Sequence, residues 1–193
     1  LLFRADSLCT RLMRMLISQV GHRYLHLIVG TFVNYIQKRI FTRRKSVNLD
    51  LLKADEDSSE REKAIEQVRT AYNFLLNMIV VTMRHIPAEI MNISQTVSRD
   101  VGNKFGEESR RTFLAGFFFL RFLVPALAQP ETTLGRDVSM PLQKFCVLIS
   151  RILQSSVNCQ EIECPNMRYA NSLVDSSQKN LEIFFTVLHT GDA

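Results

Sequence analysis

An almost unbroken apolar run from Phe117 to Leu127 constrains this chain more than any other stretch. A run this apolar must be buried, either in a protein core or in a membrane. It is too short to span a bilayer, and it contains Arg121 and Pro125, which do not suit a spanning segment. The run therefore predicts a core helix. Arg121 either reaches solvent from that helix or, if buried, bonds backbone carbonyls or a carboxylate.

Apolar residues recur at helical spacing along most of the chain. Glycine and proline number only 7 and 5, which disfavours a turn-rich β fold, and no stretch alternates as a half-buried strand would. The sequence therefore predicts an all-α fold. We expect Pro125 to stop or kink its helix and residues 128–140 to form a loop. The expected helices cover residues 8–20, 24–36, 59–85, 87–101, 107–123, 142–157 and 168–188. For the last two, helical spacing predicts the residues of the inner face: Phe145, Ile149, Ile152 and Leu153 in the first, and Leu173, Leu181, Phe184, Phe185 and Leu188 in the second.

The charge of the chain is compatible with several kinds of partner. Its net charge of +5 suits an acidic protein, an anionic membrane or nucleic acid, without choosing among them. A basic stretch at residues 38–45 is soon followed by an acidic one at residues 50–60. We interpret the two stretches as ends of one polar connection that partly neutralise each other. We therefore predict no nucleic-acid partner.

Motifs of known catalytic and metal chemistry are missing from the sequence. It has no glycine-rich phosphate loop, dinucleotide fingerprint, zinc-protease helix or nucleophile elbow. His22 and His26 lie one helical turn apart but lack a third ligand. Cys159 and Cys164 are spaced more widely than paired zinc cysteines. We therefore predict no metal site and no cofactor of the chain's own. The four cysteines show no disulfide framework, so the cytoplasm is the expected compartment.

Three sequence blocks follow one another in an informative order. The first reads LLFRADSL at residues 1–8, the second FLRFLVPA at residues 119–126, and the third LISRILQSSVN at residues 148–158. Together they resemble the finger loop, the Phe-Leu-Arg block and the third block of Ras GTPase-activating protein (RasGAP) domains. We therefore expect residues 1–193 to form a single, helical bundle-like RasGAP domain. Because the chain begins without methionine and inside a motif, we expect it to be a piece of a larger protein.

The resemblance implies a function in trans. RasGAP domains accelerate GTP hydrolysis by a Ras-like small GTPase, which carries the GTP and Mg²⁺. This chain would then be the activator of an enzyme and not an enzyme itself. Arg4 stands where the family has its catalytic arginine finger. A guanidinium is always charged and presents a rigid fork of donors that suits phosphate oxygens. It can stabilise the charge on the γ-phosphoryl group in the transition state.

The resemblance also implies roles within the other two blocks. Arg121 matches the family's second arginine, which binds carbonyls of the finger loop and holds the loop in shape. Arg151, Gln154 and Asn158 match the block that lines the groove where the GTPase switch regions dock. Their spacing of three and then four residues places them on one helical face. A basic residue at position 151 suits an acidic switch surface.

One departure from the family leaves two alternatives open. Several residues after the asparagine, where relatives often carry a lysine, this sequence has Glu161 and Glu163. Acids that face an acidic switch surface would weaken docking. The first alternative is therefore a module of the same fold that binds a small GTPase without accelerating it. The second is a helical scaffold or membrane-surface module that uses the basic stretch. Recruitment to the inner face of a membrane, through regions outside this chain, is compatible with each hypothesis.

Overall fold

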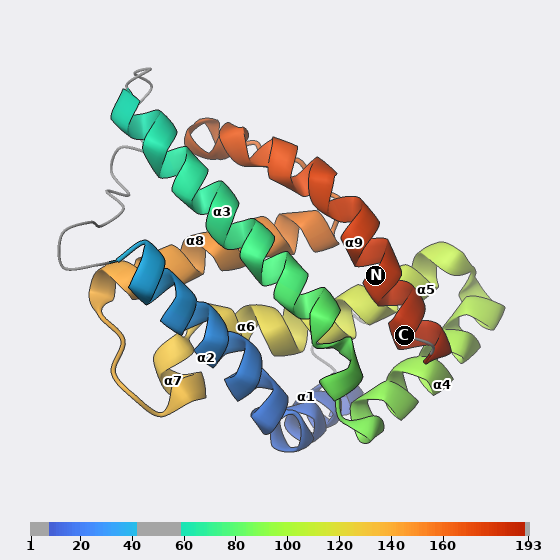
Figure 1. Ribbon diagram of the computed structural model, residues 1–193. Helices are drawn as coiled ribbons and strands as arrows, with labels where there is room; N and C mark the ends of the chain where they lie inside the picture. Colours follow the sequence, from blue (N-terminus) through green and yellow to red (C-terminus); the bar gives the residue numbers. More distant parts are fainter. Residues whose placement is uncertain (1–7, 42–58, 192–193) are drawn as a thin grey trace.

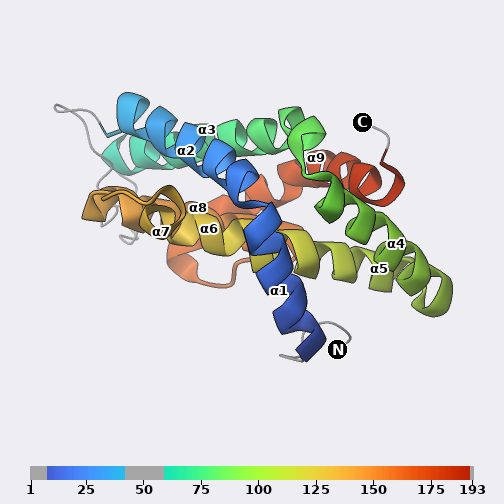
Figure 2. The same ribbon diagram turned by 90° about the horizontal axis from the view of Figure 1, so that it is seen from below.

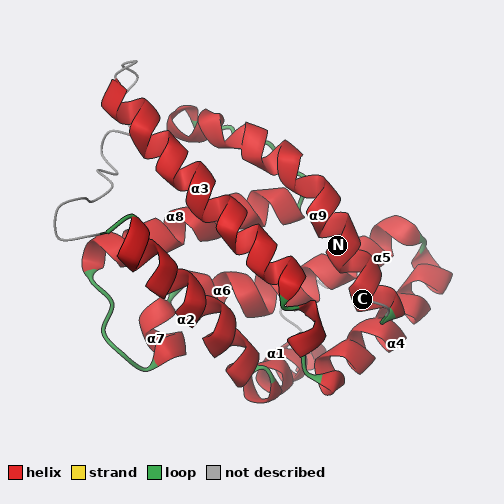
Figure 3. Ribbon diagram, viewed as in Figure 1, coloured by secondary structure: helices red, strands yellow, loops and turns green. Residues whose placement is uncertain are grey.

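The all-α prediction is confirmed. The computed structural model describes residues 8–41 and 59–191. Every regular element in these two ranges is helical and none is a strand, as Figure 3 shows. The elements are α1 (Leu8–Val20), α2 (His22–Arg39), α3 (Ser59–Val81), η2 (Met83–His85), α4 (Ala88–Phe105), α5 (Glu107–Leu114), η3 (Ala115–Leu123), α6 (Val124–Ala128), α7 (Pro130–Leu134), α8 (Met140–Val157), η4 (Pro165–Ala170) and α9 (Asn171–Thr190).

The helices pack around one hydrophobic core. α3 lies between α2 and α9 and contacts both (Figure 1). Seen from below, α2 and α3 lie on one side of the molecule and α6, α7 and α8 on the other (Figure 2). α4 and α5 pair at one end, and α1 projects from the middle near the N-terminus (Figure 2).

The apolar run lies in a long central helix. α5, η3 and α6 join into one helix, Glu107–Ala128, of 22 residues. By length and composition this helix could cross a membrane, but 67% of its most apolar window is buried inside the fold. The apolar character of the run is therefore explained by its place in the core, as predicted.

Phenylalanine rings of the central helix pack against aromatic rings of the neighbouring helices. The ring of Phe118 is fully buried, with its centroid 6.0 Å from that of Tyr24 in α2 and 4.9 Å from that of Phe184 in α9. The same ring meets those of Phe119 and Phe122 edge to face. Such aromatic pairs contribute about 0.5–1.5 kcal/mol beyond the area they bury. One ring of the central helix therefore joins α2 to α9.

The inner faces predicted for the last two long helices are confirmed. The helix predicted over residues 168–188 begins as the 3₁₀ turn η4 and becomes α-helical only at Asn171. The predicted inner residues are all buried: Phe145, Ile149, Ile152 and Leu153 in α8, and Leu173, Leu181, Phe184, Phe185 and Leu188 in α9.

The middle of the central helix departs from α-helical geometry. Over Ala115–Leu123 the backbone is a π-helix, in which an N–H bonds the carbonyl five residues back, and the Val124 N–H still bonds Phe119 O. Pro125 was expected to stop or kink the helix. It does not stop the helix, which continues to Ala128, beyond its predicted end. Pro125 lies at the start of α6, directly after the π-helix ends.

The loop predicted for residues 128–140 contains a short helix, α7. It begins at Pro130, whose fixed φ suits a first helical position, and is followed by Gly135 in the left-handed conformation, with φ 61°. Leu134 packs onto α2 at Gly30, where an added Cβ would lie 3.4 Å from Leu134 Cδ2. The loop prediction was wrong for Pro130–Leu134, because the contact with α2 comes from a distant part of the sequence, whereas residues 135–139 form no helix.

α1 forms as predicted, but several of its apolar residues face outward. Leu12 and Met15 are 56% and 60% exposed, and Leu16 is 41% exposed. Ile17 is buried instead and belongs to the core. The spacing of apolar residues thus predicted the helix correctly. Which of these residues contact the core depends on the angle at which α1 packs against the other helices.

Candidate functional site

Arg121 lies on η3, and its guanidinium is held partly by its own helix. The side chain is half-buried, and Nη1 donates a hydrogen bond to Gly116 O at 3.0 Å. A backbone carbonyl is one of the two kinds of acceptor predicted for this arginine. Gly116 leaves room for the guanidinium, because an added Cβ would lie only 2.9 Å from Nη1. The missing side chain at Gly116 is therefore part of how Arg121 is held.

Residues 1–7 of the first block, Arg4 among them, lie outside the described residues; the last residue of the block, Leu8, begins α1. This helix packs against η3, the element that carries Arg121. At the junction of α1 with α2, Gly21 is buried, and an added Cβ would overlap the ring of Phe122. The structure thus places the residues after the first block directly against the second block.

The third block lies on α8. Arg151 and Gln154 are exposed, and Asn158 is half-buried at the C-cap of the helix. Ile149 and Ile152, on the opposite face, are fully buried. None of the three polar side chains makes a hydrogen bond or ion pair with another described residue. They are therefore available to a partner molecule, and α8 also contacts η3, so the second and third blocks are neighbours.

A buried hydrogen bond ties the C-terminal end of α8 to α3. Tyr72 Oη donates to Ser156 Oγ at 2.5 Å, and Ser156 Oγ donates to Ile152 O at 3.0 Å. Burial raises the pKa of the Tyr72 phenol, so its hydroxyl keeps the proton that it donates. The last turn of α8, which carries Asn158, is therefore fixed on its core side.

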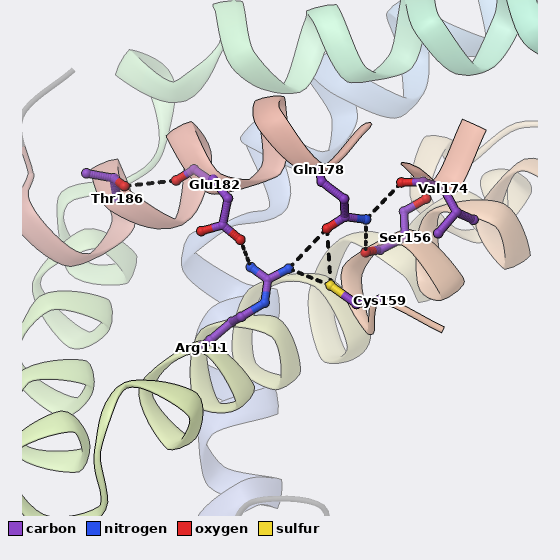
Figure 4. Close-up of polar contacts among 7 residues, drawn as sticks. All are labelled: Arg111, Ser156, Cys159, Val174, Gln178, Glu182 and Thr186. Atoms are coloured by element: carbon purple, nitrogen blue, oxygen red, sulfur yellow. Dashed lines mark hydrogen bonds and ion pairs between the residues drawn. The ribbon is translucent and has the colours of Figure 1, made fainter. Parts of the chain in front are cut away.

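A polar network fixes the same end of α8 from the other side (Figure 4). Arg111, on α5, pairs through Nη1 with Glu182 of α9. Its Nη2 donates to Cys159 Sγ at 3.0 Å and to Gln178 Oε1 at 3.3 Å. Gln178 Nε2 in turn donates to Ser156 O at 3.0 Å. We call Arg111, Cys159, Gln178 and Glu182 the Arg111 network. It connects α5 and α9 to the turn that follows α8, directly after the third block.

Sequence reasoning missed the Arg111 network. Cys159 was considered, together with Cys164, as a metal ligand or a redox residue and not as a structural contact. In the described part of the chain no group of three or more histidine, cysteine or acidic residues could hold a metal ion. Arg111 and Gln178 belong to no block, and their contacts join distant segments. No local pattern could have selected them, because each is an ordinary polar residue of an amphipathic helix.

Comparison with known proteins tests the resemblance of the three blocks. A family model described as GTPase-activator protein for Ras-like GTPase, RasGAP, matches residues 42–158, which is more than half of the chain. This chain belongs to the RasGAP family. The family match contains Arg121 and ends on Asn158, whereas Arg4 precedes it.

Curated relatives with similar sequences include proteins from three distant organisms. Identity is 22% over 98% of this chain with a Dictyostelium discoideum protein named probable Ras GTPase-activating-like protein ngap. It is 28% over 81% of the chain with the Mus musculus RasGAP-activating-like protein 1. It is 27% over 83% of the chain with the Saccharomyces cerevisiae inhibitory regulator protein IRA2. This RasGAP chain spans 22% of the length of each of the first two relatives and 5% of the third.

Proposed function

We propose that this RasGAP domain accelerates GTP hydrolysis by a Ras-like small GTPase, with Arg4 entering the GTPase active site as an arginine finger. The family match, which contains Arg121 and the whole third block, carries the proposal. The GTPase supplies the nucleotide, Mg²⁺ and its own catalytic glutamine. The domain supplies one guanidinium and a rigid surface, and it does not hydrolyse GTP alone.

Positioning of the finger is the task that we assign to Arg121. Its Nη1 already bonds a carbonyl of its own helix, and α1, which follows the finger block, packs on the same element. A guanidinium has five donors, so Arg121 can bond further carbonyls while keeping this contact. A finger that is held in shape before the partner arrives loses less entropy on binding and meets the transition state with less reorganisation.

Docking of the GTPase is the task that we assign to the outer face of α8. Arg151 and Gln154 are exposed there and Asn158 stands at the end of the helix. A cation on this face would attract an acidic switch surface and speed association, an effect that salt weakens. The face is rigid because its opposite side is buried in the core and its last turn is bonded to Tyr72.

The compartment proposed for this activity is the cytoplasm. Cys146, Cys159 and Cys164 are free thiols in the structure, which suits a reducing environment. Burial is the main cause that raises the pKa of Cys146 to about 12, and Glu131 contributes, so this thiol is a packing residue and not a nucleophile. Recruitment of the domain to a membrane would depend on regions outside this chain.

A panel of GTPases tests the proposed function. Single-turnover GTP hydrolysis is measured for Ras-, Rap- and Rho-type GTPases, each with and without the wild-type domain. We expect acceleration of at least one Ras-like member by about 10³-fold or more. If no member is accelerated while one of them binds in its GTP form, the domain is a docking module and not an activator.

That docking module is the second candidate function, and one observation favours it. Glu161 and Glu163 are both exposed in the segment that follows the third block. If they face the acidic switch surface, they oppose binding. Replacing both by lysine is then expected to tighten binding of the GTP-loaded partner, most strongly at low salt. A scaffold or membrane-surface module would instead bind anionic vesicles without regard to Arg4.

Two glycine-to-alanine variants test the role of Arg121 through its neighbour. In Gly116→Ala the new Cβ, 2.9 Å from Arg121 Nη1, displaces the guanidinium. We expect the maximal rate of stimulated hydrolysis to fall by about 10²-fold, the scale of a misplaced catalytic group. Thermal stability should change little, since a flexible side chain can move and alanine favours a helix.

Gly102→Ala is the matched control for Gly116→Ala. It is also a helical glycine, and its added Cβ would overlap the guanidinium of Arg110. Among the residues that the structure describes, Arg110 forms its ion pair with the exposed Glu107 in α5, a contact of small energetic value. Gly102→Ala is therefore expected to keep full activity. Equal loss of activity in both variants would mean that displacement of Arg121 is not the cause.

A further inference from the structure

We propose that Arg111 and Gln178 are positioning residues for GTPase docking, which hold Asn158 in place through the turn that follows it. This inference rests on the proposed function, because it concerns the same GTPase-binding face. Neither residue belongs to the three blocks, and neither lies on α8. They act from α5 and α9 on the end of the helix that carries the docking residues.

The turn after Asn158 has an unusual backbone. Cys159 has φ 51°, and it is the non-glycine residue with positive φ in the described part of the chain. The left-handed conformation costs a residue with a side chain roughly 1–2 kcal/mol. The turn is closed by two backbone bonds, from Cys159 N to Ser156 O at 3.2 Å and from Gln160 N to Ser155 O at 3.0 Å. These two bonds are the usual ones at the end of a helix, where the left-handed residue is most often glycine. The cost of placing a cysteine there can be offset by further contacts of the turn.

Gln178 supplies such contacts with both ends of its amide (Figure 4). Its Nε2 donates to Ser156 O and also to Val174 O in its own helix, at 3.0 Å and 2.8 Å. Its Oε1 accepts from Cys159 Sγ at 3.1 Å and from Arg111. The Gln178 amide thus connects the last turn of α8 to Cys159. The hydrogen bond to Val174 O, within α9, fixes the orientation of the amide.

Arg111 completes the network from α5. Its Nη2 meets Cys159 Sγ, and its Cζ lies 4.6 Å from the centroid of the Phe185 ring. Its Nη1 pairs with Glu182, which neutralises the guanidinium (Figure 4). The side chain is 26% exposed, so these contacts are partly shielded from water. With Nη1 paired to the acid and the guanidinium stacked on the ring, Nη2 is directed at the Cys159 thiol.

The consequence concerns Asn158, whose side chain has no hydrogen-bond partner among the described residues. Its place depends on the backbone, which lies between the Tyr72-bound turn of α8 and the turn held by Gln178 and Arg111. A docking residue that is already in place loses little conformational entropy when the partner binds. Loosening the network should therefore weaken docking without changing the chemical step.

Two variants separate positioning from simple stabilisation. Gln178→Met keeps the side-chain volume approximately and removes both the donor and the acceptor of the amide. Arg111→Lys keeps the charge that pairs with Glu182 but cannot also bond Cys159 and Gln178. In both variants we expect the KM for the GTP-loaded GTPase to rise about tenfold and kcat to stay within about twofold. A purely ionic role of Arg111 would be rescued by lysine and would leave KM unchanged.

Hydrogen–deuterium exchange reads the turn without a GTPase. In both variants the amides of Cys159 and Gln160 are expected to exchange faster by about tenfold, whereas amides in the middle of α8 keep their protection. The matched control is Arg69→Lys on α3, which alters an exposed pair with Glu66 and should change neither readout. Unchanged KM in both variants, or loss of protection throughout α8, overturns the inference and leaves the proposed function standing. A wild-type domain that neither binds nor activates any GTPase overturns the proposed function, and this inference with it.

Discussion

The single-turnover rate of the GTPase bound to the domain is expected to fall by about 10³-fold or more when Arg4 is replaced by alanine. The finger stabilises charge that develops only in the transition state, so its loss lowers the rate and leaves ground-state docking nearly intact. Affinity for the GTP-loaded partner, measured with a non-hydrolysable analogue, should change by less than about threefold. The rate is measured at saturating domain, so that weaker binding cannot imitate the loss.

Arg4→Lys makes the test of the finger sharper. Lysine keeps the charge but loses the planar fork that bonds two phosphate oxygens at once, so most of the activity should still be lost. Arg69→Ala, on α3, removes an exposed arginine that takes no part in the proposed site and should keep full activity. If Arg4→Lys is as active as the wild type, charge alone is sufficient. If Arg4→Ala is as active as the wild type, Arg4 is not the finger.

Replacing Phe118 by alanine is expected to lower the free energy of unfolding by about 3–5 kcal/mol, the usual cost of removing a fully buried phenylalanine. The ring joins Tyr24, Phe184 and two rings of its own helix, so its removal opens a cavity between three elements. Domains have about 5–15 kcal/mol of stability, so the loss is a large share. Thermal unfolding should shift down by roughly 10 °C.

Phe105→Ala is the matched control for Phe118→Ala. Phe105 is 48% exposed at the end of α4, and its ring faces Lys104 Nζ at 5.3 Å. Removing it should cost about 0.5 kcal/mol, as for other surface positions. Both free energies come from urea unfolding followed by circular dichroism, with the slope of the transition compared as well. Equal losses of unfolding free energy in the two variants would show that burial of the Phe118 ring contributes no more to stability than an exposed ring does.

Much of the fold could be predicted because its signals are local. Apolar residues at helical spacing mark α8 and α9, and the inner residues named from that spacing are all buried. The run from Phe117 to Leu127 was correctly expected in a core helix, since no other environment in a folded domain would accept it. The π-helix within this run was not predicted, because the backbone hydrogen-bond pattern there depends on how the side chains pack against the neighbouring helices.

The candidate site was only partly predictable, for the same reason. Arg121 and the third block were found because they belong to motifs, and motifs are stretches of adjacent residues. Arg111 and Gln178 were missed because they meet Cys159 only after three separate elements have packed. Arg4 was predicted from the first block alone, and its role as the finger stays a prediction.

The helical class, the family and the order of the three blocks follow from residue spacing and residue type, which do not change when the chain folds. Packing of the helices, in contrast, turns Leu12 and Met15 of α1 outward and places Gly116 where it makes room for Arg121. It also places α5 and α9 where they hold the end of α8. Each of these depends on the angle and distance between elements, which come from packing of the whole core and not from any single helix.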